Sequence, residues 1–202
     1  MQSLIDALAE RPDVLRLACL TPTDVDLVAL KERFAAWYVV NSGALAYIDS
    51  RRDLLLDPFG TRPWAKAALV IAFAPRPERD SPLRQLPLAR PGLPAALIAP
   101  YALHEDYHRT GQRMLAEIAD WLTAQAGNDA DALFEACVDT KPVLEKLLAE
   151  QAGIGQRAPN SLLRIPPWGC QAHLAVLFTS LALPSLILPQ PRDTLCQSCQ
   201  AC

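Results

Sequence analysis

No stretch of this sequence is apolar for long enough to cross a membrane as a helix. Such a helix needs about 20 consecutive apolar residues, and the longest apolar stretch, residues 174–188, is interrupted at Thr179-Ser180 and at Pro184-Ser185. The first six residues contain an acid and no basic side chain, unlike the positively charged start of a secretory signal. We therefore expect a cytoplasmic protein with no membrane segment.

An excess of basic residues is also missing. The chain holds 19 Lys and Arg against 22 Asp and Glu, which gives a net charge of −3. General nucleic-acid binders usually carry a basic stripe, because each phosphate that they neutralise releases counterions. The charge balance argues against that class and leaves room only for RNA held by a small local patch. The one mild concentration of arginines runs from Arg76 to Arg90.

Apolar residues make up 51% of the chain, which excludes a disordered protein. Their spacing predicts helices that alternate with strands. The expected helices are 24–38 with Thr23 as N-cap, a short piece ending near Ile48, 104–126, and 143–151 with Pro142 in its first turn and Gly153 after its end. The expected strands are 67–73, 131–138, 162–165 and 173–181, and residues 75–100, with seven prolines, are expected to form a loop. Strands separated by helices indicate an α/β domain over residues 1–190.

The six cysteines form two groups. Three of them are far apart in the sequence, and we expect plain buried cysteines at these positions: Cys19, Cys137 and Cys170. The other three follow one another at two-residue gaps: Cys196, Cys199 and Cys202. In a cytosolic chain this spacing indicates metal ligands rather than a disulfide framework.

The closely spaced cysteines match the first three of the bacterial ferredoxin run C-x2-C-x2-C-x3-C-P, in which the fourth cysteine ligates the other cluster. Structural zinc usually spaces its ligand pairs further apart. We therefore expect residues 191–202 to begin a [4Fe-4S] ferredoxin-like module. A zinc site and unliganded cysteines are the alternatives.

An acid, two phenols and an imidazole gather where the helix at 104–126 is expected to begin. They are Tyr101, Asp106, Tyr107 and His108. Such groups at a helix N-terminus can orient a polar ligand. The alternative is that Asp106 only caps the helix and that His108 lies on a solvated face.

Asp139 ends an expected buried strand and precedes Thr140-Lys141-Pro142. Open α/β folds place their ligands at the carboxyl end of the sheet, and a carboxyl group there can have a raised pKa and donate a proton. The alternative is a helix N-cap, which contributes about 1 kcal/mol.

Four stretches, in this order, match the motifs of one enzyme family. Residues 43–58 read Gly-Ala-Leu-Ala-Tyr-Ile and then contain two arginines and Asp-Pro, like the family's Gly-x-x-x-Tyr-Leu with Arg and Asp-Pro downstream. Residues 101–108 resemble Tyr-Ala-x-Gly-x-Asp-Tyr-His, and residues 138–163 resemble Asp-Thr-x-Pro-x-Leu-Glu-Arg, Ala-Gly-x-Gly and Gly-Lys-Asn-x-Leu-Leu. The fourth stretch is the cysteine run at 196–202. Together they resemble the epoxyqueuosine reductase family, cobalamin-dependent iron–sulfur enzymes that complete the tRNA base queuosine.

The resemblance implies a mixed sheet flanked by helices, in a nitroreductase-like core that binds cobalamin, and a ferredoxin-like module that supplies electrons. It implies reduction of epoxyqueuosine in the tRNA anticodon loop. We also expect an electron donor protein or reductant as partner, and of the oligomeric states, which the sequence leaves open, we favour a monomer. By the same resemblance Asp139 protonates the substrate as the epoxide opens. The implied cofactor-binding residues are Tyr101, Asp106, Tyr107, His108, Asn160, Gly169 and Cys170, and the implied cluster ligands are Cys196, Cys199 and Cys202.

The chain also departs from the family pattern. Residues 158–159 are Ala-Pro where the family has Gly-Lys, and Lys146 replaces an arginine, which removes a bidentate donor. Cys170 replaces a serine, and the aromatic residues that follow it in the family are absent here, so that Cys170 or His173 is available to face the ligand. A non-catalytic corrinoid-binding protein, or a decayed paralogue that kept the fold, is therefore the alternative function.

Overall fold

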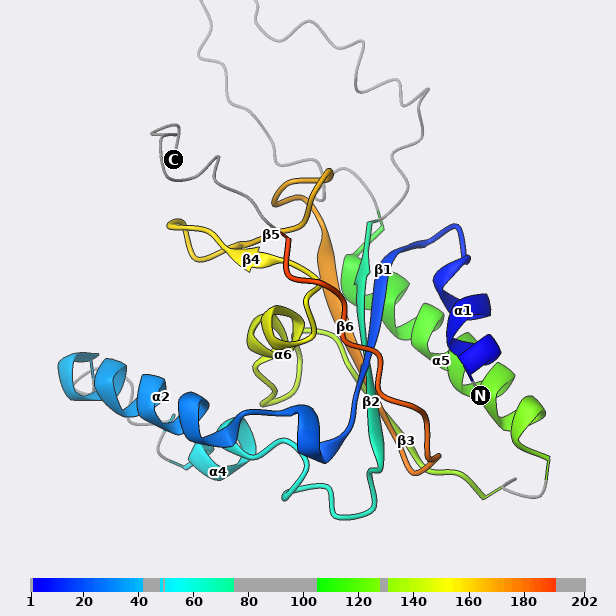
Figure 1. Ribbon diagram of the computed structural model, residues 1–202, viewed down its shortest axis with the longest axis horizontal. Coiled ribbons are helices and arrows are strands. Elements are labelled where there is room, and N and C mark those ends of the chain that lie inside the picture. The colour runs from blue at the N-terminus through cyan, green and yellow to red at the C-terminus, as the bar shows by residue number, and fades with distance from the viewer. Residues whose placement is uncertain (1, 42–47, 49, 75–104, 128–130, 192–202) are drawn as a thin grey trace, which may run out of the picture.

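A four-stranded sheet forms the centre of the computed structural model, which describes residues 2–41, 48, 50–74, 105–127 and 131–191 (Figure 1). The strand order is β1 (Val14–Leu20), β2 (Ala67–Phe73), β6 (His173–Thr179) and β3 (Phe134–Cys137). Each neighbouring pair in this sheet is antiparallel. The class is therefore α/β, as expected, but the described sheet is antiparallel throughout rather than mixed.

The two central strands are buried on both faces because their side chains alternate between two cores. In β2, Leu69, Ile71 and Phe73 pack into one core. Ala68, Val70 and Ala72, which alternate with them, pack into the other. All seven β2 residues are buried. A continuous apolar run is the signature of such a strand, and the strand expected at 67–73 is confirmed at both ends.

Helices α1 (Gln2–Ala9) and α5 (Tyr107–Ala126) cover one face of the sheet (Figure 1). The apolar stripe of α5 that packs there contains Met114, Leu115, Ile118 and Leu122. Near the start of α5, a Cβ on Gly111 would lie 2.9 Å from the Phe73 ring and 3.0 Å from Val138. The absence of a side chain at Gly111 therefore lets the first turns of α5 approach the ends of β2 and β3.

The other face of the sheet is covered by α6 (Glu145–Gln151), with the hairpin of β4 (Gln156–Arg157) and β5 (Leu163–Arg164) beyond it. Helices α2 (Leu27–Asn41) and α4 (Arg52–Leu56) lie further out on this side (Figure 1). Residues after β6 return along β1, where Cys19 and Leu186 exchange two backbone hydrogen bonds of 3.0 and 2.8 Å.

The first long helix begins later than expected. A short 3₁₀ helix, η1 (Pro22–Asp24), precedes it, and α2 starts at Leu27, where Asp26 Oδ1 accepts a 2.9 Å hydrogen bond from the Ala29 N–H. Thr23 is therefore not the N-cap. The reason is that Asp24 already closes the turn before it, by accepting the Thr21 N–H at 2.7 Å.

Two elements at the start of the chain, α1 and β1, were not expected from the sequence. Strand β1 contains Arg16, and its pairing with β2 has an irregularity between Val14 and Arg16, so its pattern is not a clean apolar run. The short piece before Ile48, the loop at 75–100 and the module at 191–202 lie largely or wholly outside the described residues. Within the described ranges, no helix is long and apolar enough to span a membrane.

Candidate functional site

The candidate site lies at one end of the sheet, where two strands end and a strand and a helix begin. β2 ends at Phe73, directly opposite His173 at the start of β6, and β3 ends at Cys137, opposite Val176. Asp139 follows β3 by two residues, and Tyr107 is the first residue of α5. The antiparallel topology thus brings together residues that are far apart in the sequence.

The Asp139 carboxylate is held by a phenol and remains accessible. Tyr107 Oη donates a 2.8 Å hydrogen bond to Asp139 Oδ2, and His108 Nε2 lies 3.9 Å from the same oxygen. The Asp139 side chain is 67% exposed. One carboxylate oxygen therefore has a fixed donor, while the side chain is open to a substrate.

Asp106 caps α5, as the sequence alternative predicted, and it also orients His108. Its Oδ1 accepts the His108 N–H at 2.9 Å and lies 2.8 Å from His108 Nδ1. The hydrogen bonds from the His108 backbone and ring lower the pKa of Asp106. An ionised carboxylate can only accept, so Nδ1 carries the ring proton and Nε2 is the nitrogen that faces Asp139.

Tyr107 is stacked against two imidazoles. Its ring centroid lies 4.0 Å from that of His108 and 4.2 Å from that of His173, and the His173 ring is nearly parallel to it at 9°. Burial lowers the pKa of His173, and burial together with the hydrogen bond to Asp139 raises the pKa of Tyr107. Tyr107 therefore keeps its proton and acts as a donor to Asp139.

Glu145 contacts Asp139 from the first turn of α6. Its Oε1 accepts a 2.7 Å hydrogen bond from the Asp139 backbone N–H. Burial raises the pKa of Glu145 to about 7, and the neighbouring Asp139 charge adds to the effect. In the sequence, Glu145 is only the glutamate of the Asp-Thr-x-Pro-x-Leu-Glu-Arg motif, because a contact between a side chain and a backbone N–H six residues away leaves no sequence pattern.

The raised pKa of Glu145 predicts a stability that depends on pH. The folded protein holds this proton more tightly than the unfolded chain, so stability falls as the pH rises from 4.5 toward 7. Glu145→Gln, which mimics the protonated acid, should therefore be more stable than wild type at pH 8 by about 2 kcal/mol and unfold at a higher temperature there. At pH 5 the two should unfold at similar temperatures. Thermal unfolding followed by circular dichroism measures this difference. A difference that does not change with pH would contradict the shift.

The remaining expected site residues lie elsewhere in the chain. Asn160 Oδ1 accepts the Leu162 N–H at 3.1 Å in the turn between β4 and β5. Gly169, with φ of +68°, closes a turn in which it exchanges two backbone hydrogen bonds with Ile165. Cys170 follows this turn and is partly exposed. Tyr101 lies outside the described residues.

The structure agrees with two of the three expected buried cysteines. Cys19 and Cys137 are buried, and burial raises the pKa of each thiol to about 12. The cysteines expected to hold a cluster, Cys196, Cys199 and Cys202, lie outside the described residues. In the described part of the chain, no group of three or more His, Cys, Asp and Glu is placed to hold a metal ion.

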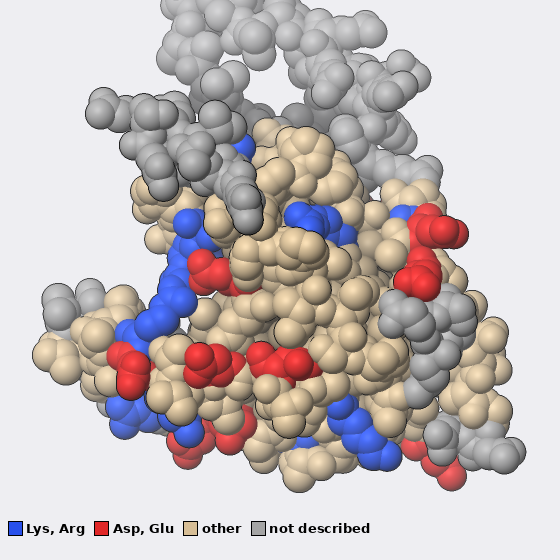
Figure 2. Space-filling view, in the orientation of Figure 1, with Lys and Arg blue, Asp and Glu red and all other residues tan. Residues whose placement is uncertain are grey.

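Charges of both signs alternate over the face drawn in Figure 2. Two arginines from different elements, Arg33 on α2 and Arg157 on β4, share the carboxylate of Glu150 at 3.5 and 2.8 Å.

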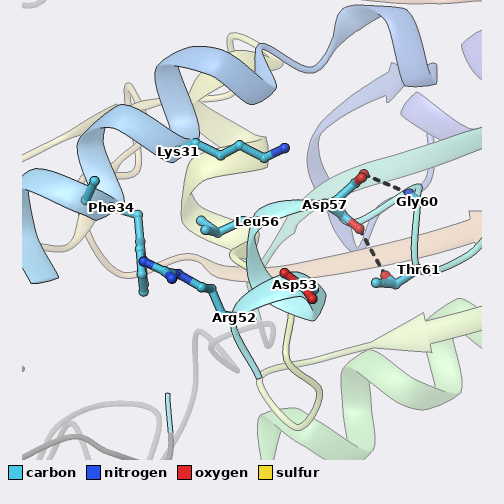
Figure 3. Close-up of a pocket in the computed structure, with 9 residues that line it drawn as sticks. Lys31, Phe34, Arg52, Asp53, Leu56, Asp57, Gly60 and Thr61 are labelled. Atoms are coloured by element: carbon cyan, nitrogen blue, oxygen red, sulfur yellow. Dashed lines mark hydrogen bonds between the residues drawn. The ribbon is translucent and has the colours of Figure 1, made fainter. Parts of the chain in front are cut away.

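An open pocket of about 560 Å³ lies between α2 and α4 (Figure 3). Lys31 and Arg52 come from opposite sides of it, and the Arg52 guanidinium lies 5.6 Å from the centre of the Phe34 ring. Asp57 shapes one edge by accepting the Gly60 N–H at 2.8 Å. Its lining side chains are separate from those that contact Asp139.

Comparisons with known proteins give one consistent result. The family model described as "Epoxyqueuosine reductase QueG, DUF1730" matches residues 56–140. An epoxyqueuosine reductase of Synechococcus sp. (strain RCC307) is 36% identical over 105 residues, which are 52% of this chain and 31% of that relative.

Two solved structures share the fold. An epoxyqueuosine reductase with an epoxyqueuosine-modified tRNA-Tyr stem loop aligns with a TM-score of 0.66 and 22% identity, over 98% of this chain and 49% of that one. A Bacillus subtilis epoxyqueuosine reductase, described with its catalytic aspartate loop swung out of the active site, aligns with a TM-score of 0.63 and 21% identity, over 98% and 49%. The chain thus spans about a third of that curated relative and about half of these solved chains. These matches show that the chain is similar to epoxyqueuosine reductases in sequence and in fold.

Proposed function

We propose that the protein reduces the epoxide of epoxyqueuosine in tRNA, with Asp139 as the proton donor. The observation that carries the proposal is the accessible Asp139 carboxylate, fixed by Tyr107 at 2.8 Å at the end of the sheet. A general acid must reach its substrate and keep a defined orientation, and this arrangement meets both conditions. A solved relative has a catalytic loop that is identified by an aspartate, and Asp139 lies on the loop between β3 and α6.

The chemistry assigns separate roles to the neighbouring side chains. Loss of an epoxide oxygen as water consumes two electrons and two protons. Asp139 gives a proton to the oxygen as the first carbon–oxygen bond breaks. Tyr107 holds Oδ2 and so leaves the rest of the carboxyl group for the substrate. His108 Nε2, 3.9 Å from Oδ2, would have to take a proton from solvent first, and could then pass it to the Asp139 carboxylate after turnover.

We propose that cobalamin supplies the electrons at this end of the sheet. The described residues fit a large group there, because the Asp139 side chain is two-thirds exposed and a Cβ placed on Gly169 would meet no atom within 4 Å. By the family resemblance, the 106–108 segment beside Asp139 would hold it together with Asn160, Gly169 and Cys170. When bound, reduced cobalamin provides the electrons that open the epoxide.

The electron supply is proposed to pass through a [4Fe-4S] cluster on Cys196, Cys199 and Cys202, since thiolates are the usual protein ligands of such clusters. The proposed substrate is a tRNA anticodon loop, because a solved relative holds a tRNA stem loop with epoxyqueuosine. We also propose a cytoplasmic location, with an electron donor protein or reductant as partner and a monomeric state.

The visible spectrum of protein purified without oxygen and supplied with cobalamin tests the cofactor assignment. We expect corrinoid absorption bands that stay with the protein on gel filtration, together with a broad iron–sulfur absorbance. Corrinoid bands without a cluster would favour the alternative, a corrinoid-binding protein that does not catalyse. The absence of both signals would contradict the proposed function.

A further inference from the structure

The backbone of Asp139 has an unusual conformation. Its φ is +53°, in the left-handed region that residues with a side chain seldom occupy. Such a conformation costs about 1 kcal/mol or more and persists only where surrounding contacts impose it. The direction of the Asp139 carboxylate therefore depends on the groups that hold the loop.

Three contacts hold this loop. Tyr107 Oη binds the Asp139 carboxylate at 2.8 Å, and Glu145 Oε1 accepts the Asp139 backbone N–H at 2.7 Å. Two residues further on, Lys141 Nζ lies 3.3 Å from Glu135 Oε1. Of the three, only the Glu145 contact involves the backbone of Asp139 itself. It is therefore the contact that most directly stabilises the left-handed conformation of Asp139.

We propose that Glu145 is a positioning residue for Asp139, and that its carboxyl group keeps the Asp139 backbone in the conformation that directs the Asp139 side chain to Tyr107. The catalytic consequence rests on the function proposed above, whereas the structural consequence does not. Glu145 is suited to this role because it extends from the first turn of a helix packed on the sheet through Leu148 and Ala149. Helix α6, which is packed on the sheet, thus holds the loop that contains Asp139.

Several charged or titratable groups interact electrostatically with Glu145. They are Asp139 on the loop, Tyr107 and His108 on α5, Lys146 on α6 and Cys137 on β3. The carboxyl oxygen of Glu145 accepts the Asp139 N–H whether or not the acid is protonated, since both forms retain an acceptor. Glutamine retains one as well, and alanine does not. A comparison of Glu145→Gln with Glu145→Ala therefore separates the effect of losing the hydrogen bond from the effect of losing the charge.

The test compares Glu145→Ala and Glu145→Gln with Glu150→Gln, a control on the same helix whose partners are Arg157 and Arg33. Amide hydrogen exchange of Asp139, measured by NMR, reports the hydrogen bond without any need for activity. We expect exchange about tenfold faster or more in Glu145→Ala, and rates within about threefold of wild type in Glu145→Gln and Glu150→Gln.

Epoxide reduction gives the second readout. We expect kcat to fall about tenfold to 100-fold in Glu145→Ala with KM little changed, and to recover most of its value in Glu145→Gln. Unchanged Asp139 exchange in Glu145→Ala, or equal loss of kcat in both variants, would overturn the positioning role. If wild type reduces no epoxide, the proposed function fails, and the exchange rates still decide whether Glu145 holds the loop.

Discussion

Replacing Asp139 by asparagine is expected to lower the rate of epoxide reduction by about 100-fold or more, the usual contribution of a general acid. Asparagine has almost the same shape but cannot supply the acidic proton. It also tolerates a left-handed φ as well as aspartate does, so the strained turn at +53° should persist. The Tyr107 hydroxyl can still donate to the side-chain oxygen of asparagine, and binding of cobalamin and of the tRNA stem loop should be retained.

Single-turnover reduction of an epoxyqueuosine-modified stem loop measures this effect free of product release. Asp120→Asn serves as the control, because Asp120 is an exposed aspartate on the same helix as Tyr107. An Asp139→Asn rate within about threefold of wild type would remove Asp139 from the mechanism. A variant that loses its near-ultraviolet circular dichroism spectrum would point to a structural role instead.

Replacing Glu135 by alanine should lower the free energy of unfolding by about 3 kcal/mol. Its partner Arg62 is only 5% exposed, donates to Glu135 Oε1 at 2.8 Å, and lies with its guanidinium 4.5 Å from the centre of the Phe178 ring. Burial alone would raise the pKa of Glu135, but the hydrogen bond and charge of Arg62, aided by Lys141, lower it. Without Glu135, a buried cation loses its counterion.

Urea unfolding followed by circular dichroism measures this loss. The control is Glu105→Ala, which breaks the exposed ion pair of Glu105 with Arg113 and should change stability far less, because solvent screens an exposed pair. The double variant Arg62→Met with Glu135→Leu should recover much of the loss, since it removes both charges from the partly buried site. Equal effects of Glu135→Ala and Glu105→Ala would show that Arg62 gains little from its partner.

The fold was predictable from the sequence where one local pattern decides the structure. The apolar run at 67–73 is short and typical of a strand covered on both faces, and the stripe on α5 has a clear helical period. The direction of the strands was not predictable, because apolar runs have the same pattern in parallel and antiparallel sheets. Strand β1 was missed because Arg16 interrupts its pattern.

The candidate site was predictable in part for the same reason. Asp139 follows a buried strand, and Asp106 precedes a helix, so both positions have local signatures. The contacts that hold Asp139 join it to Tyr107, 32 residues earlier, and to Glu145, 6 residues later. The stacking of His173 on Tyr107 arises because β6 begins beside the end of β2. Contacts of this kind depend on the strand order, which no local pattern contains.

The mass of the modified nucleoside tests the central claim most directly. The measurement incubates the anaerobically purified protein with cobalamin, a reductant and an epoxyqueuosine-modified tRNA stem loop, and then analyses the released nucleosides by mass spectrometry. We predict that wild type converts epoxyqueuosine to a product lighter by one oxygen atom, and that Asp139→Asn does not. Unchanged epoxyqueuosine after incubation with wild type that carries both cobalamin and an iron–sulfur cluster would contradict the account.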